Sequence, residues 1–296
     1  MRAGGAEGDS GGHALDGRLR GVRGAVPAAF FARENGMELF VPPENAAEVS
    51  IVEGVRAWSV PDLQSLVMHL HGEKSLETIE KREIECAEPA ADPDFSEIKG
   101  QAAAKRALEI AAAGHHNILF IGSPGSGKTM LAKALRGILP PLSDDELMEV
   151  MMLRSTAGLP FVLSRERPFR AVHHTATTAA ICGGGSWLRP GEISLASRGV
   201  LFLDEFPEFQ RDVIEALRQP LEDGSITVSR VSGSVTYPAK VLVVAACNPC
   251  PCGYAGDPEQ KCICSAASLE RYRRKLSGPI LDRIDLHIPV PRLTPE

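Results

Sequence analysis

Residues Gly122-Ser-Pro-Gly-Ser-Gly-Lys-Thr129 fit the pattern G-x-x-x-x-G-K-[ST], and this stretch decides the fold. The short apolar run before it, residues 117–121, predicts a buried strand, and residues 130–139 after it have the composition of a helix. A strand, a glycine loop and a helix in this order are the context in which a phosphate-binding loop occurs. The alternative is an ordinary glycine turn between a strand and a helix.

The residue types of this loop suit phosphate chemistry. Glycines let successive backbone N–H groups turn toward one point, and the helix that follows adds its positive N-terminal end. Lys128 is expected to reach the β and γ phosphates of a nucleotide, and the Thr129 hydroxyl to ligate Mg²⁺. The sequence therefore predicts ATP and Mg²⁺ as cofactors, with the nucleotide held by Gly122, Ser123, Pro124, Gly125, Ser126, Gly127, Lys128 and Thr129.

The overall composition is that of an ordinary globular protein. The 296 residues, 44% of them hydrophobic, suffice for one large domain or two smaller ones. A net charge of -6 and a pI near 5.8 argue against a uniformly basic nucleic-acid binder, although a local basic channel stays open. The sequence contains neither a run of 18 apolar residues nor the apolar core of a signal peptide, so we expect a cytoplasmic protein without membrane contact.

The chain divides into two expected domains. The glycine-rich residues 1–14 predict a disordered start, residues 15–82 a partial α/β domain, the proline-containing residues 83–94 a linker, and residues 95–296 the main domain. The expected elements are helices at 25–35, 62–70 and 101–113, short strands at 38–41 and 49–52, and a capping box at 143–146.

A second site follows the apolar run 199–203. A buried strand that ends in two adjacent carboxylates, Asp204 and Glu205, is how phosphate-loop ATPases place their metal and water groups. Asp204 is expected to hold the Mg²⁺ shell, and Glu205 to orient or deprotonate the attacking water. The alternative is two solvated acids at a strand end. Another apolar strand, residues 241–246, leads into Asn248.

Six motifs together carry a resemblance to the YifB/ComM family, also called magnesium-chelatase-like proteins, within the AAA+ ATPases. They are the loop 122–129, the strand 200–205, Pro190-Gly-Glu-Ile-Ser194, Gln219-Pro-Leu-Glu-Asp-Gly224, Asn248-Pro-Cys-Pro-Cys-Gly253 and residues 277–287. The resemblance covers nearly the whole chain. It departs from the family at Val172, where proline is usual, and at Glu296, beyond which relatives continue into a helical lid with a second sensor arginine.

The resemblance implies a fold and further roles. The expected fold is an α/β AAA+ P-loop NTPase core, which is a parallel sheet flanked by helices. A partial Lon-protease-like domain is expected before it. Val26 stands at the position of the catalytic lysine of Lon, so no peptidase activity is expected. Residues 95–101 resemble the segment that lines the adenine pocket. Asn248 matches the sensor residue that AAA+ proteins insert between the two carboxylate-bearing strands. Arg283 matches the arginine that reaches the nucleotide of a neighbouring subunit, which requires a homo-oligomeric ring, with a hexamer favoured.

Two segments are candidates for DNA contact. An insert with three arginines, His173, His174 and then three glycines lies between the two nucleotide motifs, and the alternating residues 226–237 around Gly233 predict a hairpin. Related ring ATPases project such segments into a central pore, so His173, His174 and Arg230 are expected to contact the DNA backbone. For the histidine pair a structural hydrogen bond or a subunit contact is the alternative. The basic residues 271–275 are expected to be a solvated helix face.

Four of the seven cysteines form two C-x-C pairs, Cys250 with Cys252 and Cys262 with Cys264. Four thiolates brought together by a turn suit tetrahedral Zn²⁺, although the usual spacing is C-x₂₋₄-C. Reduced structural cysteines are the alternative.

The sequence thus predicts an ATPase that moves DNA as a ring, and the family resemblance implies branch migration in recombination or natural transformation. The first alternative is a magnesium-chelatase-like or protein-remodelling ATPase that does not bind nucleic acid. A nucleotide-dependent assembly scaffold without useful turnover is the second.

Overall fold

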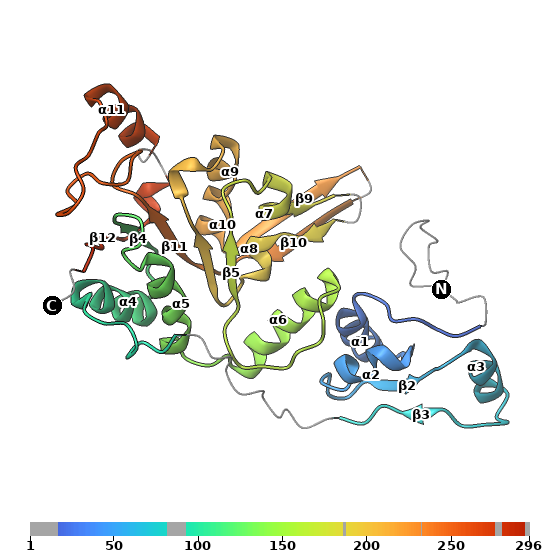
Figure 1. The fold of residues 1–296 in the computed structure, drawn as a ribbon. Helices are drawn as coiled ribbons and strands as arrows, with labels where there is room; N and C mark the ends of the chain where they lie inside the picture. Colours follow the sequence, from blue (N-terminus) through green and yellow to red (C-terminus); the bar gives the residue numbers. More distant parts are fainter. Residues whose placement is uncertain (1–16, 82–92, 186–187, 232, 276–279, 294–296) are drawn as a thin grey trace. The chain divides into compact units, whose positions relative to one another are not determined.

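The computed structural model describes residues 17–81, 93–185, 188–231, 233–275 and 280–293 (Figure 1). The chain separates into two compact units, Met1–Ala87 with Leu147–Ser164, and Glu88–Glu146 with Arg165–Glu296. The predicted disordered start and nearly all of the predicted linker lie outside the described residues. The domain boundaries at 15, 82, 94 and 296 stay predictions.

The first unit is a small sheet with helices. Parallel strands β1 and β2 pair along their whole length, and β3 is antiparallel to β2. The elements are α1 (Ala25–Glu34), β1 (Glu38–Val41), α2 (Pro43–Val49), β2 (Arg56–Ser59), α3 (Leu63–Leu70) and β3 (Glu77–Thr78). The chain returns to this unit with the later part of α6 (Asp144–Ala157), where the Ser155 carbonyl accepts a hydrogen bond from the Gly24 N–H at 2.9 Å.

The helices and strands predicted for this unit are confirmed except at one place. The helix at 25–35 and the strand at 38–41 are confirmed, and the helix at 62–70 begins at an Asp62 cap whose carboxylate accepts from the Ser65 N–H at 2.7 Å. The predicted strand at 49–52 is wrong, because Val49 ends α2 and the strand comes later, at β2. Val49 and the turn residues 50–52 that follow α2 are all buried, so the apolar side chains of Val49, Ile51 and Val52 reflect burial and not strand pairing.

The second unit is built on a five-stranded sheet in the order β12-β4-β11-β8-β5, in which every pairing is parallel. Its strands are β4 (Ile118–Ile121), β5 (Phe169–Val172), β8 (Val200–Leu203), β11 (Leu242–Cys247) and β12 (Leu286–Pro289). Every residue of β8 and β11 is buried, as expected for central parallel strands covered on both faces. The predicted parallel core is confirmed.

Two helices pack beside one another and supply much of the core, α4 (Ala102–Gly114) and α5 (Lys128–Ile138) (Figure 1). Leu108 of α4 and Leu131 and Leu135 of α5 are fully buried in one cluster with Phe120 and Phe202 of the sheet. The capping box ahead of α6 is confirmed, because Ser143 and Glu146 exchange hydrogen bonds of 3.2 and 3.3 Å between backbone N–H groups and side-chain oxygens.

The strand order determines which loops meet. The carboxyl ends of parallel strands lie at one edge of a sheet, so the ends of β4, β11 and β8 are neighbours in that order. β11 therefore separates the strand before the phosphate loop from the strand that bears Asp204 and Glu205. The expectation that Asn248 stands between two carboxylate-bearing strands is wrong in this detail, since of the two strands beside β11, β8 leads into carboxylates and β4 leads into the phosphate loop.

The insert and the predicted hairpin lie side by side. The hairpin is confirmed as antiparallel β9 and β10, and β9 contacts β6 of the insert (Figure 1). The remaining elements are α7 (Thr178–Cys182), β6 (Gly183–Gly184), β7 (Arg189–Pro190), α8 (Glu192–Leu195), η1 (Phe206–Glu208), α9 (Arg211–Ala216), α10 (Arg218–Asp223), β9 (Ser225–Arg230), β10 (Gly233–Pro238), α11 (Ala266–Lys275) and η2 (Leu281–Arg283). Among the described residues, every helix is too short or too polar to cross a membrane.

Candidate nucleotide site and cysteine centre

The phosphate loop starts at the carboxyl end of β4 and ends in the first turn of α5. Gly122 is held by its N–H, which donates to the Cys247 carbonyl of β11 at 3.1 Å. A Cβ at Gly122 would lie 2.2 Å from the Val290 carbonyl oxygen, so only glycine fits between β4 and the residue after β12. Gln101 donates to the Pro291 carbonyl at 2.6 Å and to Ser126 at 3.4 Å, which ties the loop to the end of β12.

Lys128 is folded back onto its own loop. Its Nζ donates to the carbonyls of Gly122 at 2.7 Å and Ser123 at 3.0 Å, and to Asn248 Oδ1 at 3.4 Å. Burial lowers the pKa of Lys128, and the nearby side chains of Asp204 and Cys247 partly offset this shift. The ammonium group is thus held over the loop by hydrogen bonds to carbonyl oxygens, which an anionic group can replace because it attracts the charge of the ammonium directly.

Asp204 and Glu205 lie at the end of β8, next to the start of α5. The Thr129 hydroxyl donates to Asp204 Oδ2 at 3.4 Å, so the two predicted magnesium ligands lie together. Glu205 has a left-handed backbone with φ of 52°, and its N–H donates to Asp204 Oδ1 at 2.9 Å. This conformation is rare for a residue other than glycine and concentrates at functional sites. It turns the chain sharply at the second carboxylate.

His174 contacts Glu205, which the sequence did not predict. Its Nδ1 lies 2.8 Å from Glu205 Oε2, and its ring centroid lies 4.1 Å from that of His173. His173 is fixed in turn by Thr175, whose hydroxyl lies 2.9 Å from His173 Nδ1. These residues follow β5, whose neighbour in the sheet is β8, so the strand pairing brings them to the carboxylates. The sequence carries no local signal for this contact, because it depends on β5 lying beside β8 in the sheet.

Arg283 lies at the opposite edge of the sheet. It ends η2, just before β12, and β12 runs parallel to β4, so Arg283 is at the amino edge while the phosphate loop is at the carboxyl edge. Its guanidinium forms an ion pair with Glu222 of α10. Asn117 fixes the backbone here, since its Nδ2 donates to the Arg283 carbonyl at 2.9 Å and its Oδ1 accepts from the Val243 N–H at 2.8 Å. The structure does not bring Arg283 to the phosphate loop of its own chain.

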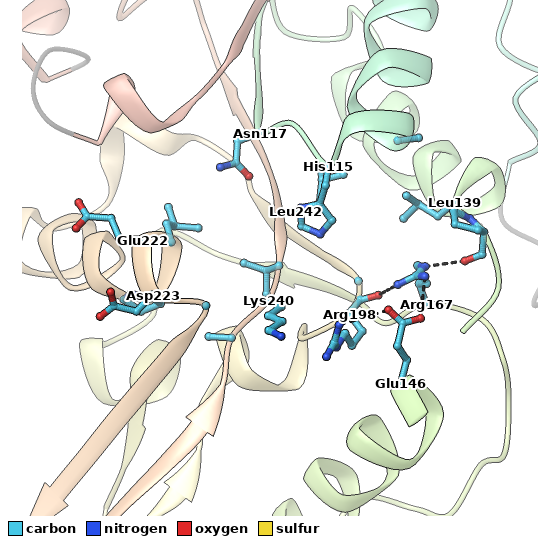
Figure 2. Close-up of a pocket in the computed structure, with 18 residues that line it drawn as sticks. His115, Asn117, Leu139, Glu146, Arg167, Arg198, Glu222, Asp223, Lys240 and Leu242 are labelled. Atoms are coloured by element: carbon cyan, nitrogen blue, oxygen red, sulfur yellow. Dashed lines mark hydrogen bonds and ion pairs between the residues drawn. The ribbon is translucent and has the colours of Figure 1, made fainter. Parts of the chain in front are cut away.

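A cavity of about 570 Å³ opens at this amino edge and not at the phosphate loop (Figure 2). His115, Asn117, Arg167, Arg198 and Lys240 are among the residues that line it. Glu146 accepts hydrogen bonds from Arg167 at 3.0 Å and Arg198 at 3.5 Å, so a carboxylate already compensates both guanidinium groups. The residues that the sequence predicts to bind phosphate and metal lie at the opposite, carboxyl edge.

The arginines of the insert are largely compensated inside the second unit. Arg165, Arg167 and Arg170 form ion pairs with Asp144, Glu146 and Glu192, respectively. Glu192 raises the pKa of Arg170 through a hydrogen bond, which keeps that pair charged. The basic character of the insert therefore does not make a free cationic surface at these three positions.

Arg230 lies at the end of β9, where the hairpin meets the insert. A Cβ at Gly184 would lie 3.2 Å from Arg230 Nη2, so the guanidinium packs against Gly184. The Tyr237 hydroxyl donates to the Leu188 carbonyl at 2.5 Å and joins the two segments again. Arg230 is exposed, as is Val231 next to it. The predicted solvated basic helix is α11, where Arg271, Arg273, Arg274 and Lys275 are exposed.

The four clustered cysteines converge on one point. The Sγ of Cys250 lies 3.3 Å from that of Cys252 and 3.7 Å from that of Cys262, and Cys252 and Cys262 are 3.6 Å apart. Cys264 belongs to the same group, in which all the sulfur atoms lie within 4.8 Å of one another. Thiolates at about 2.3 Å from a tetrahedral Zn²⁺ stand about 3.8 Å apart, so the donor set fits the ion.

The comparisons with known proteins agree with the geometry. The family model of magnesium chelatase, subunit ChlI, matches residues 94–296. The chain is 46% identical over 286 residues to competence protein ComM of Haemophilus influenzae, covering 95% of this chain and 56% of that protein. It is 45% identical over 281 residues to YifB of Salmonella typhimurium, covering 94% of this chain and 54% of that protein.

The chain belongs to the YifB/ComM magnesium-chelatase-like family. The α/β core is accordingly of the AAA+ type. A more distant similarity, 28% identity over 174 residues, covers 58% of this chain and 22% of the probable DNA helicase MCM9 of Arabidopsis thaliana. The chain spans little more than half of the length of ComM and YifB, so the activity and partners of the whole protein are matters for proposal.

Proposed function

We propose that this family member binds and hydrolyses ATP as the motor core of a homo-oligomeric ring that moves DNA. The observation that carries the proposal is the convergence of Lys128, Thr129, Asp204, Glu205 and Asn248 at one edge of the sheet, delivered by β4, β8 and β11. These are the cation, hydroxyl, carboxylate and amide groups that phosphoryl transfer to water requires.

The roles follow from the positions. The loop N–H groups and Lys128 bind the nucleotide phosphates, and Thr129 with Asp204 holds Mg²⁺, which neutralises charge on the phosphate oxygens. Glu205 follows Asp204 directly and lies at a sharp turn of the backbone. It orients the attacking water and accepts its proton. Asn248, which already contacts Lys128, positions the same water from the neighbouring strand.

Arg283 supplies the remaining positive charge from a neighbouring subunit. The four residues of β4 separate the two sheet edges by about 13 Å at roughly 3.3 Å per residue, which puts the guanidinium out of reach of its own loop. A head-to-tail arrangement, in which the amino edge of one chain faces the carboxyl edge of the next, brings Arg283 to the phosphate loop of the neighbour. Such an arrangement forms a ring when the rotation between successive chains closes on itself. A hexamer is favoured by the family resemblance.

Substitution of the proposed general base tests the hydrolysis. Glu205→Gln should keep ADP affinity and lower steady-state ATP turnover by about 100-fold or more, because proton transfer by a positioned carboxylate is worth that much. Glu208→Gln is the matched control, since Glu208 lies three residues later and pairs with Lys275 at 3.0 Å. Unchanged turnover in Glu205→Gln would refute the assigned role of Glu205.

DNA as the substrate is supported by the adjacent hairpin and insert, by the exposed Arg230 and by the names of two relatives, competence protein ComM and the probable DNA helicase MCM9. We propose that Arg230, His173 and His174 contact the backbone phosphates. The test is binding of a fluorescent forked DNA at low salt, followed by a salt titration. Binding that weakens steeply with salt is expected, and the absence of binding by the assembled protein would defeat the DNA proposal.

The second candidate is a magnesium-chelatase-like or protein-remodelling motor that acts on a protein partner and does not bind nucleic acid. The match of the family model favours it. Forked DNA separates the candidates, because a protein-remodelling motor shows ATP turnover that DNA does not stimulate.

The cysteine centre is proposed to bind zinc through Cys250, Cys252, Cys262 and Cys264. The spacing of the sulfur atoms supports this assignment, and backbone N–H groups of Cys252 and Ala255 donate to Cys264 Sγ at 3.4 Å and Cys250 Sγ at 3.2 Å, as they do to thiolate ligands. Metal analysis of the purified chain should give about one equivalent of zinc.

A further inference from the structure

The cysteine centre and the phosphate loop are built against each other. Residues 248–265 connect β11 to α11 and contain neither helix nor strand, so the cysteine cluster is what closes this long loop. The loop begins at Asn248, whose Oδ1 accepts from Lys128 Nζ at 3.4 Å and whose carbonyl accepts from the Tyr272 hydroxyl at 2.9 Å. One end of the cysteine loop is therefore already part of the nucleotide site.

A glycine between the two C-x-C pairs packs directly on the phosphate loop. A Cβ at Gly253 would lie 2.7 and 2.8 Å from Cδ and Cγ of Pro124, so Gly253 packs closely against the proline ring. Gly253 is buried and is fixed by its N–H, which donates to the Cys250 carbonyl at 2.9 Å. The position of this contact thus depends on Cys250, a proposed zinc ligand.

A polar contact adds to the apolar one. The fully buried side chain of Asp257 faces the Ser123 hydroxyl, which lowers the pKa of Asp257. Arg292, which follows β12, donates to Glu259 at 3.0 Å and to the Pro124 carbonyl at 3.3 Å, so it fastens the cysteine loop and the phosphate loop to the same guanidinium. Gly253 and Asp257 of the cysteine loop thus contact the phosphate loop, and Glu259 is joined to it through Arg292.

We propose that the four-cysteine centre is a metal-held brace for the phosphate loop, so that zinc occupancy sets the affinity for nucleotide. The proposal rests on the proposed nucleotide and zinc binding. Because an irregular loop has few contacts of its own, the free energy of metal binding orders it. Without the metal, residues 253–259 no longer contact Pro124 and Ser123. The free energy needed to order the phosphate loop then comes from nucleotide binding, which lowers the affinity for nucleotide.

The experiment compares zinc content with ADP affinity in the purified full chain. The chain and its Cys262→Ser/Cys264→Ser variant are measured for zinc by elemental analysis, for ADP binding with Mg²⁺ by calorimetry, and for thermal unfolding. We expect the variant to lose zinc and to bind ADP on the order of tenfold more weakly, about 1.4 kcal/mol. Cys182→Ser, in α7 and outside the cluster, is the matched control and should change neither quantity.

A second pair of variants tests the contact with the metal left in place. Gly253→Ala puts a methyl group into the Pro124 ring and should weaken ADP binding while zinc content is kept. Gly256→Ala carries the same backbone strain, with φ of 79° against 88°, but its methyl group meets no atom within 4 Å, and it should bind ADP like the unaltered chain. Equal effects of the two substitutions on ADP affinity overturn the brace.

The outcomes separate the brace from the functions on which it rests. ADP affinity that is equal in zinc-loaded and zinc-free chains overturns the brace and leaves the ATPase proposal intact. A purified chain without zinc overturns the metal assignment and the brace with it. A zinc-loaded chain that binds no ADP overturns the proposed ATPase itself.

Discussion

The imidazole of His174 lies 2.8 Å from the carboxylate of Glu205, the proposed general base. The contact comes from the end of β5, the strand beside β8, and the ring of His173 packs against His174 in a tilted arrangement. A carboxylate that must point at a water molecule benefits from a neighbour that limits its rotamers. We therefore treat His174 as a positioning residue for Glu205, in addition to its proposed contact with DNA.

Replacing this histidine should separate turnover from binding. We expect His174→Asn to lower kcat by up to about 100-fold, because a displaced carboxylate no longer directs the water, and to leave ADP affinity unchanged. Steady-state kinetics and calorimetry measure the two quantities. His287→Asn is the control. His287 lies on β12 and contacts the Ile284 carbonyl at 3.1 Å, so its substitution should leave kcat and ADP affinity unchanged. A loss confined to KM would contradict the positioning role.

Mixing two inactive variants tests whether Arg283 acts between subunits. Lys128→Ala removes nucleotide binding, and Arg283→Ala should lower turnover on the order of 1000-fold without changing ADP affinity. Because each variant keeps the part that the other lacks, a mixture should regain a measurable fraction of ATPase activity. Arg271→Ala, on the exposed face of α11, is the control for loss of a positive charge. A mixture as inactive as its components would argue that Arg283 acts within one chain or has no catalytic role.

Replacing Arg230 of the hairpin should change the salt dependence of DNA binding. Arg230→Ala is expected to weaken binding to forked DNA and to lower the slope of log K against log salt by about 0.7 to 0.9, the value for one lost phosphate contact. The control is Arg106→Ala, because Arg106 is exposed on α4 and pairs with Glu109 at 2.7 Å. Equal slopes for Arg230→Ala and the unaltered chain would remove Arg230 from the interface.

The lowered pKa of Lys128 predicts opposite effects of alkaline pH on stability and on binding. Between the folded-state pKa and the ordinary value of 10.5, the unfolded chain holds this proton and the folded chain does not, so this group makes folding more favourable as pH rises. Over the same interval the loop loses its cation, and ADP affinity should fall. The measurement is ADP affinity, and the Tm difference from Lys128→Met, at several pH values. A constant Tm difference would mean that burial does not shift this lysine.

The sequence was sufficient for those parts of the site that lie next to one another along the chain. The glycine pattern of residues 122–129 and the apolar run before Asp204 indicated two strand ends, and Gly233 indicated the hairpin, because each signal is local. The strand at 49–52 was wrong for the same reason, since a local apolar run does not distinguish a strand from a buried turn.

Contacts between segments that are distant along the chain could not be predicted from such local signals. The pair His174 with Glu205 depends on β5 lying beside β8, and the contact of Gly253 with Pro124 depends on β11 lying beside β4. The three insert arginines suggested a basic surface, but Asp144, Glu146 and Glu192 compensate them. Charge along a sequence does not say which charges will pair in the fold.

Arg283 and the phosphate loop lie at opposite edges of one sheet, and this placement determines how many complete ATPase sites an assembly contains. A series of n chains joined head to tail and left open has n − 1 complete sites, with a lone loop at one end and a lone arginine at the other. Closure adds one further site without adding a chain. ATPase activity per chain should therefore rise with the number of chains in the assembly and reach its full value only in the closed ring. Loss or displacement of one subunit would lower the turnover.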